Sequence, residues 1–121
     1  MTFDEALQHA QHWAAAWNAH DLDRILSFYA DDVVFEVSTA VTRWQKPDGK
    51  LRGKSELRKH FGLGLQLAPQ LRFEIETVFL APSGYAVLYR RDNGNRVVDC
   101  VALDSDGLAS HAIAYYAGAQ Q

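Results

Sequence analysis

Asp99 is the residue whose type and surroundings point most directly to chemistry. It is a single carboxyl in an apolar run, between Val97-Val98 and Cys100-Val101. An unpaired carboxylate buried in such a run carries a large free-energy cost. If the side chain points into the interior, loss of water raises its pKa and makes Asp99 a possible acid or base. The alternative is that it faces solvent or an interface, or forms a structural ion pair.

The partner of Asp99 depends on the register of a hairpin, which Asp92-Asn93-Gly94 predicts. A two-residue turn puts Arg90 on the same face as Asp99 and offers an ion pair. A three-residue turn that includes Asp92 puts Tyr89 there instead and offers a phenol beside the carboxylate. Because a slip of one residue exchanges the two faces of a strand, the sequence leaves both registers open.

Two tryptophans, Trp13 and Trp17, lie one turn apart on the first predicted helix. Their rings could line a cavity, and the indole N–H of Trp13 could donate to Asp99 or to a ligand. Plain core packing is the more ordinary role for Trp17, and for Trp13 the two roles are balanced. We expect further lining from apolar and aromatic residues on the strands and the third helix, among which Tyr116 could orient a ligand through its hydroxyl. These residues are Phe35, Val37, Phe61, Leu103 and Tyr116.

The remaining reactive residue types give weaker signals. His60, beside Phe61, titrates in a useful range, although an exposed or capping histidine is the more common situation. His9 and His12 have a spacing compatible with a metal, but no carboxylate or thiol completes a site, so we expect no metal. Cys100 lacks an activating neighbour and is interpreted as a small apolar residue. There is no glycine-rich phosphate loop or nucleophile motif, and no cofactor is implied.

Basic residues gather in one segment, which holds seven of the twelve lysines and arginines: Arg43, Lys46, Lys50, Arg52, Lys54, Arg58 and Lys59. Only Asp48 and Glu56 oppose them there. If this segment rims the mouth of a cavity, it would favour an anionic ligand, whereas a solvated basic face is the more common arrangement. Nucleic-acid binding is a weaker interpretation, because only Trp44 interleaves the charges.

The elements that would position these residues follow from hydrophobic spacing and capping signals. A capping box at Thr2 to Glu5 opens a helix whose apolar stripe continues to Trp17. A second helix, capped by Asp21, carries apolar residues to Tyr29, and a third is capped by Ser55 and ends before Pro69. Predicted strands cover 33–37, 71–76, 85–91, 96–103 and 108–116, while 38–53 is irregular with a turn at 47–49.

This order predicts an α+β fold in which a curved, mostly antiparallel sheet wraps around three N-terminal helices as one domain over 1–121. The last two strands are apolar at nearly every position, so we expect the outer sheet face to be buried in a homodimer.

The bulk composition bounds the partners of the chain. Its 121 residues are 48% hydrophobic and 22% charged, with a formal net charge of −3. This balance gives no reason to expect nucleic acid or a membrane as partner. A single cysteine allows no internal disulfide, and the N-terminus does not resemble a signal peptide, so we expect a cytoplasmic protein.

Three segments together resemble the nuclear-transport-factor-2-like superfamily, and within it the branch of SnoaL-like and ketosteroid-isomerase-like proteins. They are WNAHDLD at 17–23, FYADDV at 28–33 and GKSEL at 53–57. The resemblance covers essentially the whole chain and implies a cystatin-like cone with a pocket. It says little about activity, because the superfamily holds isomerases, cyclases, hydrolases, dehydratases, binding proteins and assembly modules.

The resemblance to ketosteroid isomerase implies a site that this chain retains only in part. The position of that family's general-base aspartate falls on Val37, which cannot accept a proton. Its tyrosine on the first helix falls on Trp13, and a supporting tyrosine falls on Phe61. Only its second aspartate has a counterpart, at Asp99. A general base typically raises the reaction rate by roughly 100-fold or more. Because this chain lacks that base, we do not expect it to use the ketosteroid isomerase mechanism.

Three hypotheses follow. The first is a small cofactor-independent isomerase, cyclase or hydrolase, acting on an apolar substrate that is anionic or carries a carbonyl group. Asp99 would transfer the proton, while Trp13 and either Tyr89 or Arg90 would orient the substrate. The second is a non-catalytic ligand-binding protein, and the third is a dimerisation module whose pocket is incidental.

Overall fold

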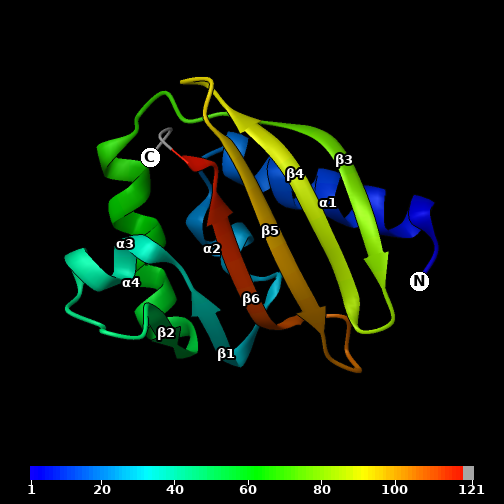
Figure 1. Cartoon of the computed structure of the whole chain (residues 1–121), viewed down its shortest axis with the longest axis horizontal. Helices are drawn as coiled ribbons and strands as arrows, with labels where there is room; N and C mark the ends of the chain where they lie inside the picture. The colour runs from blue at the N-terminus through cyan, green and yellow to red at the C-terminus, as the bar shows by residue number, and fades with distance from the viewer. Residues whose placement is uncertain (119–121) are drawn as a thin grey trace.

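The computed structural model describes residues 1–118, which form a curved sheet with helices on its concave side (Figure 1). The helices are α1 (Phe3–Asn18), α2 (Leu22–Leu26), α3 (Ser38–Arg43) and α4 (Gly53–Leu67). The strands are β1 (Tyr29–Glu36), β2 (Lys50–Arg52), β3 (Phe73–Ala81), β4 (Gly84–Arg91), β5 (Arg96–Leu103) and β6 (Ala109–Tyr116). Their order in the sheet is β2-β1-β6-β5-β4-β3. Only β1 and β6 pair in parallel, so the predicted α+β fold with a mostly antiparallel sheet is confirmed.

The first helix forms where the capping box predicted it. The Thr2 hydroxyl accepts from the Glu5 backbone N–H at 3.1 Å, and the Glu5 carboxylate accepts from the Thr2 N–H at 2.8 Å. Its buried stripe combines alanines, such as Ala6 and Ala10, with Trp13 and Trp17. Small residues let the helix approach the sheet closely, while the two indoles extend into the space beyond. The helix lies across β3 and β4 on the concave side (Figure 1).

The second helix is shorter than predicted, because Tyr29 belongs to β1 rather than to a helix. The register between β1 and β6 shifts between Tyr29 and Val34. This irregularity leaves Asp31 and Asp32 exposed to solvent, while Tyr29 and Val33 remain buried. Two adjacent acids therefore lie within the strand instead of ending a helix.

The segment 38–53 is more ordered than its sequence suggested, since it contains α3 and β2. The structure thus has four helices over residues 1–118 instead of the predicted three. Ser55 lies inside α4 and does not cap it. The N-cap is Arg52, whose backbone N–H donates to the Glu56 carboxylate at 2.9 Å. Gly53 follows with φ +83°, a left-handed conformation that favours glycine at this sharp entry to the helix.

The hairpin between β4 and β5 has the three-residue turn, so the second of the two registers is confirmed. The Arg91 N–H donates to the Asn95 carbonyl at 2.7 Å, and Gly94 has φ +86°. A glycine in this conformation closes a three-residue loop with a bulge. Asp99 pairs with Val87, and Tyr89 and Asp99 therefore share the concave face.

The outer face of the sheet is largely apolar. Cys100 and Ile113 pair on it, and Phe79 and Tyr115 are 56% and 53% exposed there. Charge gathers near the β4–β5 hairpin, where Glu76 accepts hydrogen bonds from Arg90 and Arg96. No helix within residues 1–118 has both the length and the apolar character needed to cross a bilayer.

Candidate active site

A cavity of about 410 Å³ lies between the concave sheet face and helices α1 and α4. Most of the residues that the sequence singled out lie in its wall: Trp13, Trp17, Phe35, Val37, Phe61, Tyr89, Asp99 and Tyr116. They come from α1, α4 and four regions of the sheet, so only the fold brings them together. Three of the positions at which this chain departs from ketosteroid isomerase, Val37, Trp13 and Phe61, thus surround the same space as Asp99.

Two predicted lining residues do not belong to this wall. Arg90 lies on the outer face because the three-residue turn assigns Tyr89 and Arg91 to the inner one, and its guanidinium pairs with Glu76 at 3.0 Å. Leu103 is the last residue of β5 and packs against the core outside the cavity. Of the two alternatives for the partner of Asp99, the structure therefore places Tyr89 and not Arg90 in the cavity, and Leu103 does not line it.

Asp99 is 3% exposed and faces the cavity from the middle of β5. The Tyr89 hydroxyl donates to its carboxylate at 3.5 Å. Within residues 1–118, no cationic side chain lies within ion-pairing distance of it. Burial raises the pKa of Asp99 to about 7, and the Tyr89 hydrogen bond opposes that rise only in part. The group can therefore exchange protons near neutral pH.

Tyrosine hydroxyls surround this carboxyl. Burial, and after it the negative charge of Asp99, raises the pKa of Tyr29, Tyr85, Tyr89 and Tyr116. All four phenols consequently stay protonated at neutral pH and can act as hydrogen-bond donors. The Tyr85 hydroxyl is engaged with Nδ1 of His9 at 2.6 Å, whereas Tyr29, Tyr89 and Tyr116 line the cavity.

Trp13 acts on Tyr29 rather than on Asp99. Its indole N–H donates to the Tyr29 hydroxyl oxygen at 3.1 Å, so the predicted contact with the carboxylate is not formed. Because Tyr29 accepts this bond, its own proton remains available for a group in the cavity. Sequence reasoning missed Tyr29 because it placed this residue on a helix. Its parity with Phe35 and Val37 along a strand would have identified it.

Trp17 lines the cavity, and its polar atom is fully buried. It is 6% exposed, and its indole nitrogen has no hydrogen-bond partner among the described residues. Its ring packs edge-on against Phe61 with centroids 4.9 Å apart and lies 5.2 Å from Phe73. A buried donor without a partner costs about 1–3 kcal/mol.

His60 is buried instead of exposed, and it stays neutral at neutral pH. Its Nδ1 accepts from the Trp44 indole N–H at 3.0 Å, which assigns the proton to Nε2, and Nε2 lies 3.5 Å from the Thr39 hydroxyl. Burial and, second, the charge of Arg43 lower the pKa of His60 to about 4. The imidazole therefore contributes polarity to the wall without a charge.

Two arginines lie at one end of the cavity, Arg91 from the end of β4 and Arg43 from the last turn of α3. Sequence reasoning named neither as a site residue. Arg91 has the same strand parity as Tyr89, which is the signal that would have identified it. Asn93 and Asn95 of the hairpin line the same region.

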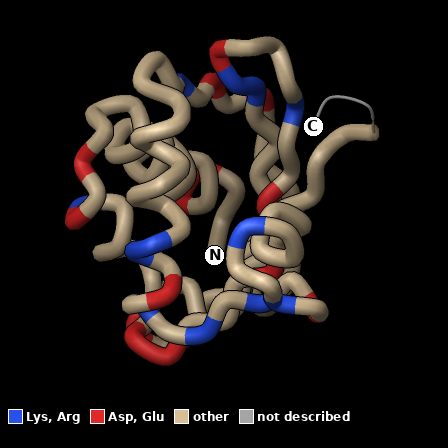
Figure 2. The backbone as a smooth tube through the Cα atoms, turned by 90° about the vertical axis from the view of Figure 1, so that its left-hand side faces the viewer, with Lys and Arg blue, Asp and Glu red and all other residues tan. Residues whose placement is uncertain are grey.

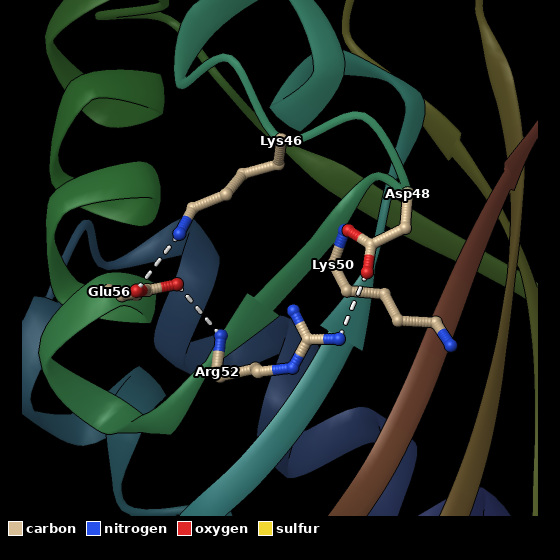
Figure 3. Close-up of polar contacts among 5 residues, drawn as sticks. All are labelled: Lys46, Asp48, Lys50, Arg52 and Glu56. Carbon is tan, nitrogen blue, oxygen red and sulfur yellow. Dashed lines mark hydrogen bonds and ion pairs between the residues drawn. The ribbon is translucent and has the colours of Figure 1, made fainter.

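The rest of the basic segment does not form a funnel into the cavity. Figure 3 shows Lys46 paired with Glu56 and Arg52 paired with Asp48, at 3.1 and 2.9 Å. Arg58 pairs with Asp23 at 2.9 Å, so an acid from another part of the chain also neutralises part of the basic segment. Along the face that carries α3 and α4, basic and acidic positions are interspersed (Figure 2). Of the seven basic residues, only Arg43 lines the cavity.

Metal ligands do not gather in this site or elsewhere in the described chain. Residues 1–118 contain no group of three or more His, Cys, Asp or Glu side chains that could hold a metal ion. His9, which has metal-compatible spacing with His12, uses its Nδ1 for Tyr85.

Known structures share this architecture. A SnoaL-like protein of unknown function from Burkholderia thailandensis is 34% identical, with a TM-score of 0.92 over 97% of this chain and 98% of that one. A protein with a cystatin-like fold from Methylobium petroleophilum is 15% identical, with a TM-score of 0.77 over 100% of this chain and 81% of that one. A candidate isomerase of the SnoaL-like family from Agrobacterium tumefaciens is 19% identical, with a TM-score of 0.73 over 95% and 99%.

The two more distant likenesses establish the fold alone. No curated protein matches the chain. The sequence model of the SnoaL-like domain matches residues 10–111, which include the second half of α1, the other three helices, most of the sheet and Asp99. Together with the similarity to the Burkholderia protein, this match shows that the chain belongs to the SnoaL-like domain family.

Proposed function

We propose that the protein binds an apolar molecule with a carbonyl group and transfers a proton on it with Asp99. The observation that carries this proposal is a carboxyl only 3% exposed, facing a cavity of about 410 Å³. Its single hydrogen bond, from Tyr89, is 3.5 Å long. Bulk water or a neighbouring cation would keep a carboxyl ionised at neutral pH. Without either, the carboxyl can take a proton and return it. General acid–base catalysis requires this property.

The proposed reaction begins with the Asp99 carboxylate taking a proton from the carbon next to the substrate carbonyl. The C–H bond breaks, its electron pair forms a C=C bond, and the carbonyl oxygen becomes an enolate oxygen. Asp99 is then a neutral acid and returns the proton to the same or a conjugated carbon. An isomerisation completed in this way consumes no other reactant.

Donors for the enolate oxygen are available in the wall. The Tyr29 hydroxyl accepts from Trp13 and keeps its own proton, and Tyr116 also lines the cavity as a protonated phenol. Donors already in place where charge develops are worth about 100- to 1,000-fold each in rate. The roles differ from those of ketosteroid isomerase, because Val37 occupies that family's base position and Asp99 must itself be the base.

The test is deuterium exchange at the α-carbon of enolisable ketones, followed by NMR with 2-tetralone and 4-phenylcyclohexanone as probes. We expect the protein to accelerate exchange over buffer, and Asp99→Asn to remove about 100-fold of that acceleration or more. Asp32→Asn is the matched control, since Asp32 is exposed on β1. Exchange that is equally fast in Asp99→Asn would exclude Asp99 as the base.

Non-catalytic ligand binding is the second candidate. Asp99 is the only carboxyl among the residues that line the cavity, and neutral His60 is occupied by Trp44. A site with one proton-transferring group suits binding as well as chemistry. In this case ketones would bind and quench tryptophan fluorescence, but neither the wild type nor any variant would accelerate exchange.

We also propose that the outer sheet face forms a homodimer. The support is the apolar character of that face, where Phe79 and Tyr115 are exposed and Cys100 pairs with Ile113. Exposed apolar patches of this kind are typical of interfaces. Light scattering after gel filtration should give the mass of a dimer, and Phe79→Lys should shift it to that of a monomer. Phe3→Lys, on α1, is the control. A monomeric wild type would contradict the proposal.

A further inference from the structure

The end of the cavity formed by the β4–β5 hairpin and α3 carries two guanidinium groups, of which the described chain neutralises only that of Arg91, through a long ion pair. Arg43 forms no ion pair within residues 1–118. The guanidinium of Arg91 reaches only Asp92, at 3.8 Å, and its Nε is buried without a hydrogen-bond partner among these residues. This situation differs from that of Lys46 and Arg52, which have carboxylate partners at 3.1 and 2.9 Å (Figure 3).

The two guanidinium groups act on one point inside the cavity. The charges of both Arg91 and Arg43 lower the pKa of Tyr116, against the larger upward effects of burial and of Asp99. The Tyr116 hydroxyl therefore lies within electrostatic range of both arginines. Two cations and a phenolic donor thus line the same part of the cavity.

The only carboxyl of the wall lies away from this end. Asp99 pairs with Val87, and Arg91 follows four residues further along β4. At about 3.3 Å per residue the two positions are roughly 13 Å apart along the strand. The pKa of Asp99 responds to burial and to Tyr89 and shows no effect of either arginine. The guanidinium groups and Asp99 therefore occupy separate positions along the sheet, and Tyr116 lies within electrostatic range of both.

We propose that the ligand carries a carboxylate, which Arg43, Arg91 and Tyr116 bind at this end while the apolar body extends toward Asp99. The inference rests on the proposed function and adds the class of substrate: an aryl or alicyclic carboxylic acid with its reactive carbonyl group remote from the acid. A carboxylate matches guanidinium groups in shape and hydrogen bonding. A phosphate is less suited, since the cationic end offers side chains and no glycine-rich loop of backbone N–H donors.

The test compares 2-naphthylacetate with 2-naphthylacetamide, which have nearly the same shape and differ in charge. Calorimetry at low salt should show the acetate binding at least about tenfold more tightly, because hydrogen bonds to charged groups are worth about 1.5–3 kcal/mol. Arg91→Met and Arg43→Met should each reduce the ratio of the two affinities several-fold, and the double variant should bring it close to one. Methionine retains most of the apolar stem of arginine, which limits changes in packing.

Arg90→Met is the matched control, because Arg90 neighbours Arg91 in sequence but lies on the outer face with Glu76. It should leave the affinity ratio unchanged. The inference is overturned if the acetate has no advantage, if neither naphthalene compound binds, or if Arg91→Met and Arg90→Met behave alike. Tighter binding of 2-naphthyl phosphate than of the acetate would overturn the choice of carboxylate.

The two proposals fail separately. Exchange of the neutral ketone 2-tetralone tests Asp99 and requires no anionic group on the substrate. If that exchange depends on Asp99 while the acetate has no advantage, the proposed function stands and the carboxylate inference is wrong. If the acetate advantage depends on Arg91 and no ketone exchanges, the protein binds organic acids without the proposed chemistry.

Discussion

The Tyr89 hydroxyl and the Asp99 carboxylate face each other across β4 and β5 at 3.5 Å. An O–H···O hydrogen bond is ordinarily about 2.7 Å long, so this contact stabilises the ionised carboxylate only weakly. Burial therefore dominates, and the pKa of Asp99 rises to about 7. A shorter bond, or an arginine in place of Tyr89, would hold the group ionised and deprive it of its proton at neutral pH.

Removing this contact should move the pH profile of catalysis upward. In Tyr89→Phe the carboxylate loses the hydrogen bond that lowers its pKa, so the midpoint of α-proton exchange should lie above that of the wild type. We expect a shift of less than about one unit because the bond is long. Measuring the ketone exchange rate across the neutral range checks this. A midpoint that moves downward would show that Tyr89 does not stabilise the ionised form.

The same burial should make protein stability depend on pH. The pKa of Asp99 is 3.8 when unperturbed and about 7 in the folded state, so the folded protein binds more protons than the unfolded chain between these values. The stability that the neutral carboxyl contributes is complete below about pH 4 and is lost as the pH rises through about 7. A difference of roughly three pKa units corresponds to about 4 kcal/mol.

Asp99→Asn removes this loss, since an amide does not ionise. Its unfolding free energy should resemble that of the wild type near pH 4 and exceed it by a growing amount up to about pH 7. Above that pH the excess should stay constant. Urea denaturation at several pH values measures the difference, and Asp32→Asn should show no such trend because Asp32 is exposed. A constant difference across this range would mean that Asp99 is ionised throughout.

Tyr29 is expected to stabilise the enolate, with Trp13 holding it in place. Tyr29→Phe should slow ketone exchange by about 10- to 100-fold while changing ligand affinity little. Trp13→Phe keeps an aromatic ring beside Phe73 and Tyr89 but removes the bond to the Tyr29 hydroxyl, and it should have a smaller effect on rate. Tyr115→Phe is the control, because Tyr115 is 53% exposed on the outer face. Equal rates in Tyr29→Phe and Tyr115→Phe would remove Tyr29 from the mechanism.

Filling the cavity should abolish binding without altering any reacting group. Ala114 lines the cavity and pairs with Asp99 across β5 and β6, so a phenylalanine there would occupy the space beside the carboxyl. Ala114→Phe should lose affinity for every naphthalene and ketone probe in calorimetry. Ile113→Phe adds a ring to the opposite sheet face and serves as the control. Undiminished binding in Ala114→Phe would place the ligand elsewhere.

Sequence patterns predicted the fold and eight residues of the cavity wall because local rules govern both. The capping box opened α1 at Phe3, and alternation of side chains put Phe35 and Val37 on one face of a strand. The errors arose where long-range pairing overrides local signals. Tyr29 had helical spacing, but β6 pairs with it and makes it part of β1.

Which polar side chains of β4 face the cavity depends on the register of the β4–β5 hairpin, and the sequence left two registers open that differ by one residue. The two possible hairpin turns exchanged Arg90 for Tyr89 beside Asp99, and only tertiary structure selects between them. The observed three-residue turn also places Arg91 on the cavity side of β4. Arg43 could not be singled out from its basic neighbours, because their neutralisation by acids such as Glu56 and Asp23 depends on contacts between distant elements.

The central claim is that Asp99 is a buried carboxyl that titrates near neutral pH inside the cavity. Carbon-13 NMR of aspartate side chains, with Asp99→Asn to identify the signal, measures this titration directly. The account predicts a midpoint of about 7 for Asp99. A midpoint near the ordinary aspartate value of about 3.9 would contradict it, since that carboxyl would be ionised and hydrated at neutral pH.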